Sequence, residues 1–305
     1  MMSRWWVYQR ERFPVLAHGL LIAAFSFSAV FFSALLRGQT TVPAPASVVV
    51  AFVTAFLFFL QLRIADEFKD FEEDSRYRPY RPVPRGLVSL RELGALGALA
   101  ALVQLGLALW LKPALALLLG LTWTYLALMS KEFFVGEWLK KRHVLYMVSH
   151  MAIIPLVDFY ATACDWLPAE GAAPRGLFWF VAASYFNGIV IETGRKIRAP
   201  ADEEHGVNTY SALWGRRNAV LVWCAALLGT AGCASAAAWR VDFLVPVVCV
   251  LGAMLAAAGF VAFRFLRDPV PGSGKRIETF SGIWTLLLYL SVGAVPLLWR
   301  WWHTG

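Results

Sequence analysis

Apolar residues fall into nine long segments separated by short polar ones. Each segment holds about 20 mostly apolar residues, enough for a helix to cross the ~30 Å hydrocarbon core of a bilayer. The segments lie near residues 14–36, 46–64, 89–111, 113–130, 143–163, 176–194, 218–239, 243–263 and 278–299. The pattern predicts an all-α integral membrane protein with nine transmembrane helices, organised as a single domain over residues 1–305.

Composition and charge support this class and predict an orientation. The chain is 59% hydrophobic with a mean hydropathy of +0.59, whereas soluble domains are about 45–50% apolar. Lys and Arg gather in the N-terminal tail and after the second, fourth, sixth and eighth segments. Such residues favour the cytoplasmic side, so we expect a cytoplasmic N-terminus. The net charge of +8 then reflects topology and attraction to membrane lipid, and predicts no nucleic-acid partner.

The most charged stretch directly follows the second apolar segment. Pro43 and Pro45 suit a helix start, and no helix breaker occurs before Pro79, so one helix is expected from about Ala46 to Ser75. Asp66, Asp70 and Asp74 then lie four residues apart on one helix face, where their charges repel. Either this is a solvated helix end, or a cation binds there. The first polar motif comprises residues 65–87.

A second polar motif, residues 192–215, follows the sixth apolar segment. Basic residues at a helix end commonly bind its last carbonyl groups. Three of them beside Glu192, before more acids, exceed what capping requires. Both motifs follow even-numbered segments, so we expect them on the same, cytoplasmic, side of the membrane.

Two acidic clusters at the mouth of an apolar bundle suit a diphosphate ester with a hydrocarbon tail. Magnesium prefers oxygen ligands and is usually shared between one or two carboxylates and substrate phosphates. The predicted Mg²⁺ ligands are Asp66, Asp70, Asp74, Glu192 and Asp202, and the first four are also the predicted catalytic residues. The residues predicted to bind the diphosphate are Arg78, Arg81, Arg195, Lys196 and Arg198. The predicted chemistry is ionisation of an allylic diphosphate, with a dry pocket that shields the cation.

Further polar positions lie near these motifs. Ionisable groups inside membrane helices usually face the bundle interior. Possible contacts to an acceptor or to the cation are Tyr146, His150 and Asn187. The loop KEFFVGEWLKKRH, residues 131–143, has two interpretations: an interfacial anchor made by its aromatic side chains and lysines, or a cap over an active site.

The first motif resembles the signature of the UbiA superfamily of intramembrane prenyltransferases, NDxxDxxxD followed by an RP-rich loop. Asp66 stands at the usual Asn position, Glu67 at the next acidic position, and Asp70 and Asp74 at the later aspartates. Arg81, Pro82, Pro84 and Gly86 match the loop, and GVNTYSALWG resembles the continuation of the second signature. The resemblance implies nine helices around a central cavity, an Mg²⁺ cofactor and an isoprenyl diphosphate substrate.

The second motif departs from the usual DxxxDxxxD. Glu192 takes the first position, Lys196 the next, and Ala199 and Pro200 stand where a later aspartate is expected. This departure suggests that Arg195, Lys196 and Arg198 bind the diphosphate, while Glu192 keeps one metal or orients Lys196.

Three functions are compatible with this sequence. The first is an Mg²⁺-dependent prenyltransferase that passes the prenyl group to a hydrophobic or aromatic acceptor. The second is a UbiA-type terpene cyclase or lyase, in which no acceptor takes part. The third is a transporter or binding protein for a phosphorylated lipid. We expect a multi-pass protein of a bacterial inner membrane, with its site facing the cytoplasm.

Overall fold

The structure is a computed structural model that describes residues 3–304, and within that range it contains only helices, turns and loops. Eight helical segments are long and apolar enough to cross a membrane. They are α2 (Val15–Leu36), α3 (Pro45–Lys69), α5 (Leu90–Leu111), α8 with α9 (His143–Ala169), α10 (Leu177–Arg195), α12 (Arg216–Trp239), α13 (Leu244–Arg267) and α14 with α15 (Ser273–His303). The all-α membrane class is therefore confirmed.

The fourth predicted segment, residues 113–130, forms a shorter helix, α6 (Leu115–Ser130), of 16 residues. At 1.5 Å per residue it is about 24 Å long, somewhat less than the hydrocarbon core. The chain turns sharply before α6: α5 ends at Leu111, and Lys112, the residue before Pro113, is extended. The count of nine spans and the central cavity stay predictions.

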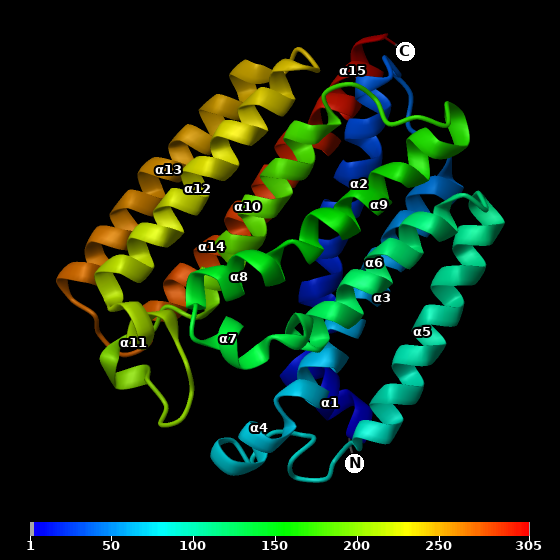
Figure 1. The fold of residues 1–305 in the computed structure, drawn as a ribbon. Coiled ribbons are helices and arrows are strands. Elements are labelled where there is room, and N and C mark those ends of the chain that lie inside the picture. Colours follow the sequence, from blue (N-terminus) through cyan, green and yellow to red (C-terminus); the bar gives the residue numbers. More distant parts are fainter. Residues whose placement is uncertain (1–2, 305) are drawn as a thin grey trace.

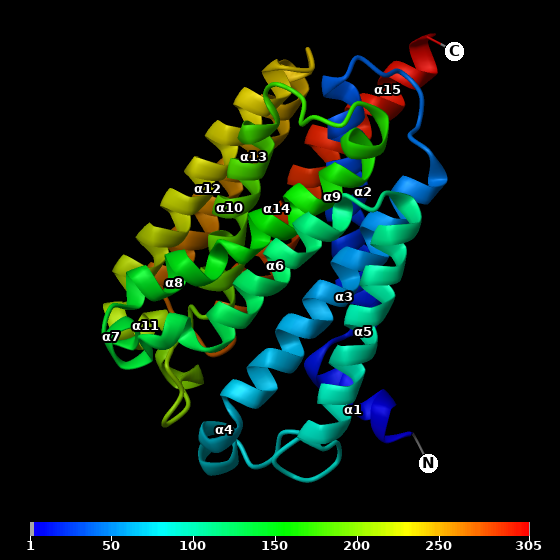
Figure 2. The same cartoon turned by 45° about the vertical axis from the view of Figure 1, so that its right-hand side comes forward.

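Short helices gather at one end of the bundle. They are α1 (Arg4–Arg12), α4 (Phe71–Tyr77), α7 (Gly136–Lys140) and α11 (Tyr210–Trp214) (Figures 1 and 2). The described C-terminal end, in α15 (Val295–Thr304), lies at the opposite end of the bundle. Both polar motifs therefore lie at the end that also carries the N-terminal helix α1.

Two helices of the bundle are interrupted for identifiable reasons. Between α8 (His143–Met151) and α9 (Ile153–Ala169) the chain breaks at Ala152, because Pro155 has no N–H to donate to the carbonyl four residues earlier. Between α14 (Ser273–Tyr289) and α15 a π-helical turn, η3 (Leu290–Ala294), contains Gly293 packed on the Ser28 backbone of α2. A Cβ on Gly293 would meet the Cα of Ser28 at 2.6 Å, so α2 can pass only a glycine this closely.

Large apolar side chains fill the interior. Trp223, Trp284, Tyr160, Tyr289 and Phe32 are among the largest fully buried side chains. The interior also holds a fully buried acid, Asp158 of α9. Around this core α10 packs against α9, α12 and α14, which places its polar last turn at the end of the bundle that carries the motifs.

Candidate functional site

The first acidic cluster does not lie on one continuous helix. Helix α3 ends at Lys69, and Asp70 (φ −95°, ψ 5°) separates it from α4. The predicted helix through Ser75 is therefore wrong at its last turns. Acidic residues are unfavourable at the C-terminal end of a helix dipole, and after the bend they fall in the first turn of α4, where the dipole favours them.

The bend gives Asp74 partners of its own. Its two carboxylate oxygens bind Arg78 at 2.7 Å and Arg81 at 2.6 Å, and Asp74 is 1% exposed. Both arginines come from the loop that follows α4. The predicted metal ligand Asp74 and the predicted phosphate ligands Arg78 and Arg81 thus bind one another, and they fix the loop against α4.

Asp70 and Asp66, one helical turn apart, are much less neutralised. Asp70 makes no side-chain hydrogen bond or ion pair with another of residues 3–304. Burial, and after it the neighbouring Asp66 carboxylate, raise the pKa of Asp70. Asp66 has one long ion pair, 3.5 Å to Arg63. Two adjacent acids with so little compensation form a place where a cation would be stabilised.

The second cluster is an ion-paired group at the end of α10. Glu192, 6% exposed, binds Arg195 at 2.6 Å through Oε2 and Lys196 at 2.8 Å through Oε1. The Tyr210 hydroxyl of α11 lies 3.5 Å from Oε1, and burial, followed by Glu192, raises the pKa of Tyr210, which keeps it a donor. Both oxygens of Glu192 are therefore engaged by side chains.

The remaining predicted residues of the second motif hold loops together. Asp202 accepts a hydrogen bond from the backbone N–H of Gly272 at 2.8 Å, and Glu203 accepts one from Thr209. Arg198 lies 3.6 Å from Glu278 of α14. Within residues 3–304 no group of three or more His, Cys, Asp or Glu side chains is arranged to hold a metal ion.

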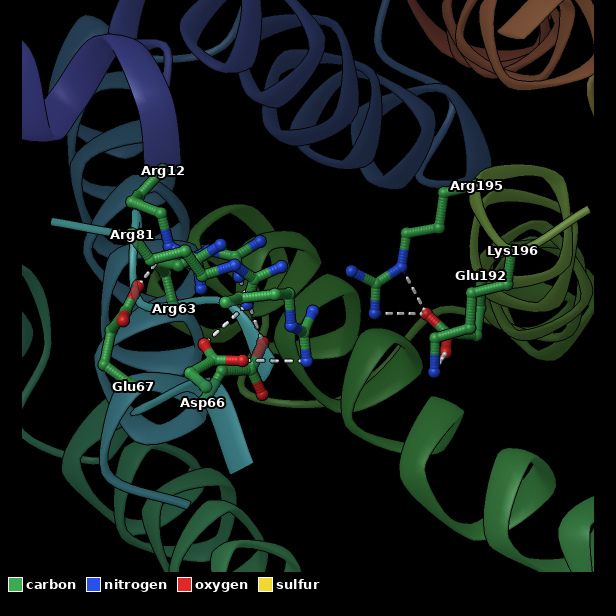
Figure 3. Close-up of polar contacts among 10 residues, drawn as sticks. Arg12, Arg63, Asp66, Glu67, Arg81, Glu192, Arg195 and Lys196 are labelled. Carbon is green, nitrogen blue, oxygen red and sulfur yellow. Dashed lines mark hydrogen bonds and ion pairs between the residues drawn. The ribbon is translucent and has the colours of Figure 1, made fainter. Parts of the chain in front are cut away.

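The two clusters face each other across the end of the bundle. Figure 3 shows Arg63 and Asp66 on one side and Glu192, Arg195 and Lys196 on the other, with the Arg195 guanidinium directed between them. Arg195 interacts electrostatically with both Asp66 and Arg63. Cations and acids thus alternate around the gap between α3 and α10.

The loops that flank the clusters also touch. The hydroxyl of Tyr80 donates to Glu204 at 3.1 Å, and the ring of Tyr77 lies edge-on to His205 at 5.9 Å. These contacts join residues of the first motif to residues of the second, which lie more than one hundred positions away in sequence.

The three predicted acceptor or cation contacts lie in different surroundings. Tyr146 and His150 stack on each other in α8, at 3.9 Å between ring centroids. Asn187 of α10 is 3% exposed, and its Oδ1 accepts a hydrogen bond from Thr285 at 3.1 Å. The structure brings the first two together and leaves Asn187 in the packed interior.

Several charged residues of the site were not predicted. Arg12 of α1 binds Glu67 at 2.5 Å, and Lys69 binds Glu132 at 3.0 Å and donates to the Tyr146 hydroxyl (Figure 3 shows the Arg12 pair). Lys69 and Arg63 lie next to the acids in sequence, so their presence in the site could have been predicted. The ion pairs of Arg12 and Lys69 join residues far apart in sequence, and nothing in the sequence predicts them.

The donor set fits one magnesium ion better than two. Asp66 and Asp70 are acids with spare oxygen ligands, and Mg²⁺ commonly takes one or two carboxylates, waters and substrate phosphate oxygens. In the second cluster the place of a cation beside Glu192 is filled by Arg195 and Lys196.

Comparisons with known proteins identify the family and the fold of this chain. The family model of the UbiA prenyltransferase family matches residues 26–281. No protein of curated function matches the chain. The ligand-free structure of a UbiA homologue from Aeropyrum pernix K1 superposes with a TM-score of 0.69 at 15% identity, covering 90% of this chain and 96% of that one.

Two further structures have the same fold. A digeranylgeranylglyceryl phosphate synthase superposes with a TM-score of 0.61 at 14% identity, covering 96% of this chain and 99% of its own. A UbiA homologue from Archaeoglobus fulgidus, bound to DMAPP and Mg²⁺, gives 0.57 at 12% identity, covering 93% and 98%. The chain is therefore a multi-pass integral membrane protein that belongs to the UbiA prenyltransferase family.

Proposed function

We propose that this protein is an intramembrane prenyltransferase that ionises an isoprenyl diphosphate and transfers the prenyl group to an acceptor. The observation that carries the proposal is that the weakly compensated acids Asp66 and Asp70 lie at the end of α3, and that Asp66 faces Arg195 of α10 (Figure 3). Family membership supports the reaction class, and the Archaeoglobus fulgidus homologue was crystallised with DMAPP and Mg²⁺.

The proposed roles divide between the two clusters. Asp66 and Asp70 would hold Mg²⁺, which when bound supplies positive charge to the departing diphosphate. Arg195 and Lys196 bind diphosphate oxygens on the opposite side, and Arg63 lies beside Asp66 in the first cluster. Glu192 orients the two cations by accepting an ion pair from each. This division makes one metal sufficient, because side-chain cations supply the charge that a second metal would bring.

The other predicted residues have supporting roles in this proposal. Asp74 fixes Arg78 and Arg81, and with them the loop that covers the first cluster. Asp202 and Arg198 tie the second loop to α14 and the turn before it. None of these five needs to contact the diphosphate for the site to work.

The proposal extends to topology. We infer that the single domain over residues 1–305 spans the membrane nine times, with a cytoplasmic N-terminus and with residues 65–87 and 192–215 at the cytoplasmic face. Two observations support this inference: Lys and Arg are concentrated in the segments on that side, and the two described chain ends lie at opposite ends of the bundle.

Purified protein incubated with geranylgeranyl diphosphate and MgCl₂ tests the function. We expect diphosphate release that stops when EDTA removes the metal, and a prenylated product when an acceptor is supplied. Formation of a cyclic hydrocarbon or a cyclic alcohol when no acceptor is supplied would identify a terpene cyclase. Flux of the diphosphate into liposomes without its cleavage would identify a transporter, and either result contradicts the proposal.

A further inference from the structure

Helix α8 carries a buried histidine beside the proposed diphosphate site. The break of the helix at Ala152 ends α8 just after His150, and the ring of His150 stacks on Tyr146 at an interplanar angle of 15°. The side chain of His150 is buried, with the residue 9% exposed. Its ring also interacts electrostatically with Lys69 of α3 and Glu192 of α10, so it lies near both clusters.

The two ring nitrogens of His150 have different surroundings. Nδ1 lies 2.8 Å from the backbone carbonyl oxygen of Tyr146. A carbonyl oxygen only accepts, so Nδ1 carries the hydrogen and Nε2 presents a lone pair. Nε2 is buried and has no hydrogen-bond partner among residues 3–304. A buried acceptor left unpaired is unfavourable, so its retention calls for a ligand that donates to it.

The polar groups around His150 are already occupied. Lys69 donates to the hydroxyl of Tyr146 and forms an ion pair with Glu132 at 3.0 Å. Glu132 also binds Lys140 at 3.5 Å. Nε2 of His150 is therefore a buried acceptor of this cluster that has neither a hydrogen bond nor an ion pair within residues 3–304.

A strained turn covers this cluster. Glu132, Phe133 and Phe134 all have left-handed backbone conformations, with φ of 50°, 54° and 60°. Such conformations are unfavourable for residues other than glycine, and they persist where surrounding contacts enforce them. Here the turn is held by ion pairs of Glu132 with Lys69 and Lys140, and the rings of Phe133 and His150 meet edge-on with 6.0 Å between their centroids.

We propose that a hydroxyl-bearing acceptor binds beneath the turn Glu132–Phe134 and donates its hydroxyl hydrogen to Nε2 of His150. This inference rests on the proposed function and names the acceptor class and its base. The C1–O bond of the isoprenyl diphosphate breaks, and the diphosphate leaves with the electron pair. The acceptor oxygen donates a lone pair to C1, a C–O bond forms, and the hydroxyl proton passes to Nε2.

The turn must move for this acceptor to reach Nε2, because Phe133 packs against the His150 ring and Tyr125 in the described conformation. Its strained backbone suits a segment that opens, because opening would relieve the strain while it breaks the ion pairs of Glu132 with Lys69 and Lys140. Phe134 and Trp138, 79% and 49% exposed, lie outside the core and remain available to anchor the loop at the interface.

Product partitioning tests the proposal with a readout other than total turnover. Wild type, His150→Ala and His150→Gln are incubated with geranylgeranyl diphosphate, MgCl₂ and each of three probes, phenol, 4-hydroxybenzoate and octan-1-ol. Released diphosphate, prenyl ether and geranylgeraniol are quantified separately. We expect both variants to release diphosphate while the ratio of ether to geranylgeraniol falls roughly 100-fold, the usual contribution of a general base. Added imidazole should partly restore the ether with His150→Ala.

A matched histidine at the far end of the bundle serves as control. His303 of α15 has its Nδ1 2.8 Å from the carbonyl of Trp299 and its ring 4.1 Å from that indole, so it repeats the local arrangement of His150. His303→Ala should leave the product ratio unchanged. Thermal unfolding of each variant checks folding, and His150→Gln keeps a polar side chain of similar length if the alanine variant unfolds.

The outcomes separate this inference from the proposed function. If wild type releases no diphosphate, the proposed function fails. If wild type releases diphosphate but forms no ether with any probe, or if both His150 variants keep the wild-type product ratio, the function stands and the role of His150 is overturned.

Discussion

At the scale of single residues, two aspartates four positions apart have opposite surroundings. Asp74 is buried and bound by two arginines, whereas Asp70 has no ion pair within residues 3–304. A buried ion pair stabilises the position of its partners, and an uncompensated acid is available to a metal ion. Under the proposed function, Asp74 is then a structural residue and Asp70 a metal ligand, although both belong to one motif.

Asp70→Asn should lower Mg²⁺-dependent diphosphate release by at least about 100-fold, because it removes a charged metal ligand. The thermal unfolding temperature should not fall, since the repulsion with Asp66 that raises the Asp70 pKa is relieved. Glu72→Gln, which neutralises an exposed acid two positions away, is the control and should keep wild-type release. Near-normal turnover of Asp70→Asn would contradict the assignment of a metal site at Asp66 and Asp70.

Arg195→Ala should raise the KM for the diphosphate roughly 10-fold or more, since a charge-assisted contact to phosphate contributes about 1.5–3 kcal/mol. Lys196 still neutralises Glu192 in this variant, so the fold should persist. Steady-state kinetics over a range of geranylgeranyl diphosphate concentrations measure the effect. Arg276→Ala removes the same charge from the exposed surface of α14 and is the matched control. An unchanged KM for Arg195→Ala would contradict the proposed contact.

At the scale of elements, the site is assembled from loops that meet at the end of the bundle. The loop after α4 contacts the loop before α11 through Tyr80 with Glu204 and Tyr77 with His205. Gly206 lies beneath the ring of Tyr77 with φ +76°, where a Cβ would run into that ring. The contact between the two motifs therefore depends on a glycine.

Gly206→Ala should lower kcat/KM for the diphosphate by separating these loops. Gly38→Ala provides a close control, because Gly38 also has φ +76° but a Cβ there meets no atom within 4 Å. Both variants carry the same left-handed strain, and only Gly206→Ala displaces Tyr77. We expect Gly206→Ala, compared with Gly38→Ala, to lose activity and to regain part of it in combination with Tyr77→Ala. Equal kcat/KM values for the two glycine variants would show that the loop contact has no functional role.

At the scale of the whole molecule, the helix bundle carries both polar motifs at one end. The helices α1, α4, α7 and α11 lie there, whereas α15 ends on the opposite side (Figure 1). Water and anionic lipid headgroups at that end can solvate the charged clusters, while large apolar side chains fill the interior. This arrangement suits a substrate with a charged head and an apolar tail.

Reporter fusions test the inferred topology. With green fluorescent protein or alkaline phosphatase fused after Gly305 and expressed in a bacterium, we expect phosphatase activity and no fluorescence, since nine spans place the C-terminus outside. The same pair fused after Arg142, in the loop before α8, should give the reverse pattern. Fluorescence from the C-terminal fusion would mean an even number of spans.

The sequence alone determined the membrane class, the position of each apolar helix and the location of both polar motifs. These features depend on local composition, because about 20 apolar residues in a row have few alternatives to crossing a bilayer. The resemblance carried by residues 65–87 also identified the family that the comparisons confirm. The even spacing of three aspartates suggested one continuous helix, and the bend at Asp70 shows that spacing did not decide the backbone.

Only the tertiary structure decided which charges pair. Arg12 reaches Glu67, Lys69 reaches Glu132, and Arg195 approaches Asp66 from another helix. Such pairs are set by helix packing and by the avoidance of unpaired buried charge, neither of which local sequence records. For the same reason the sequence could not show that Nε2 of His150 lacks a hydrogen-bond partner within residues 3–304. That property depends on which neighbouring polar groups are already paired.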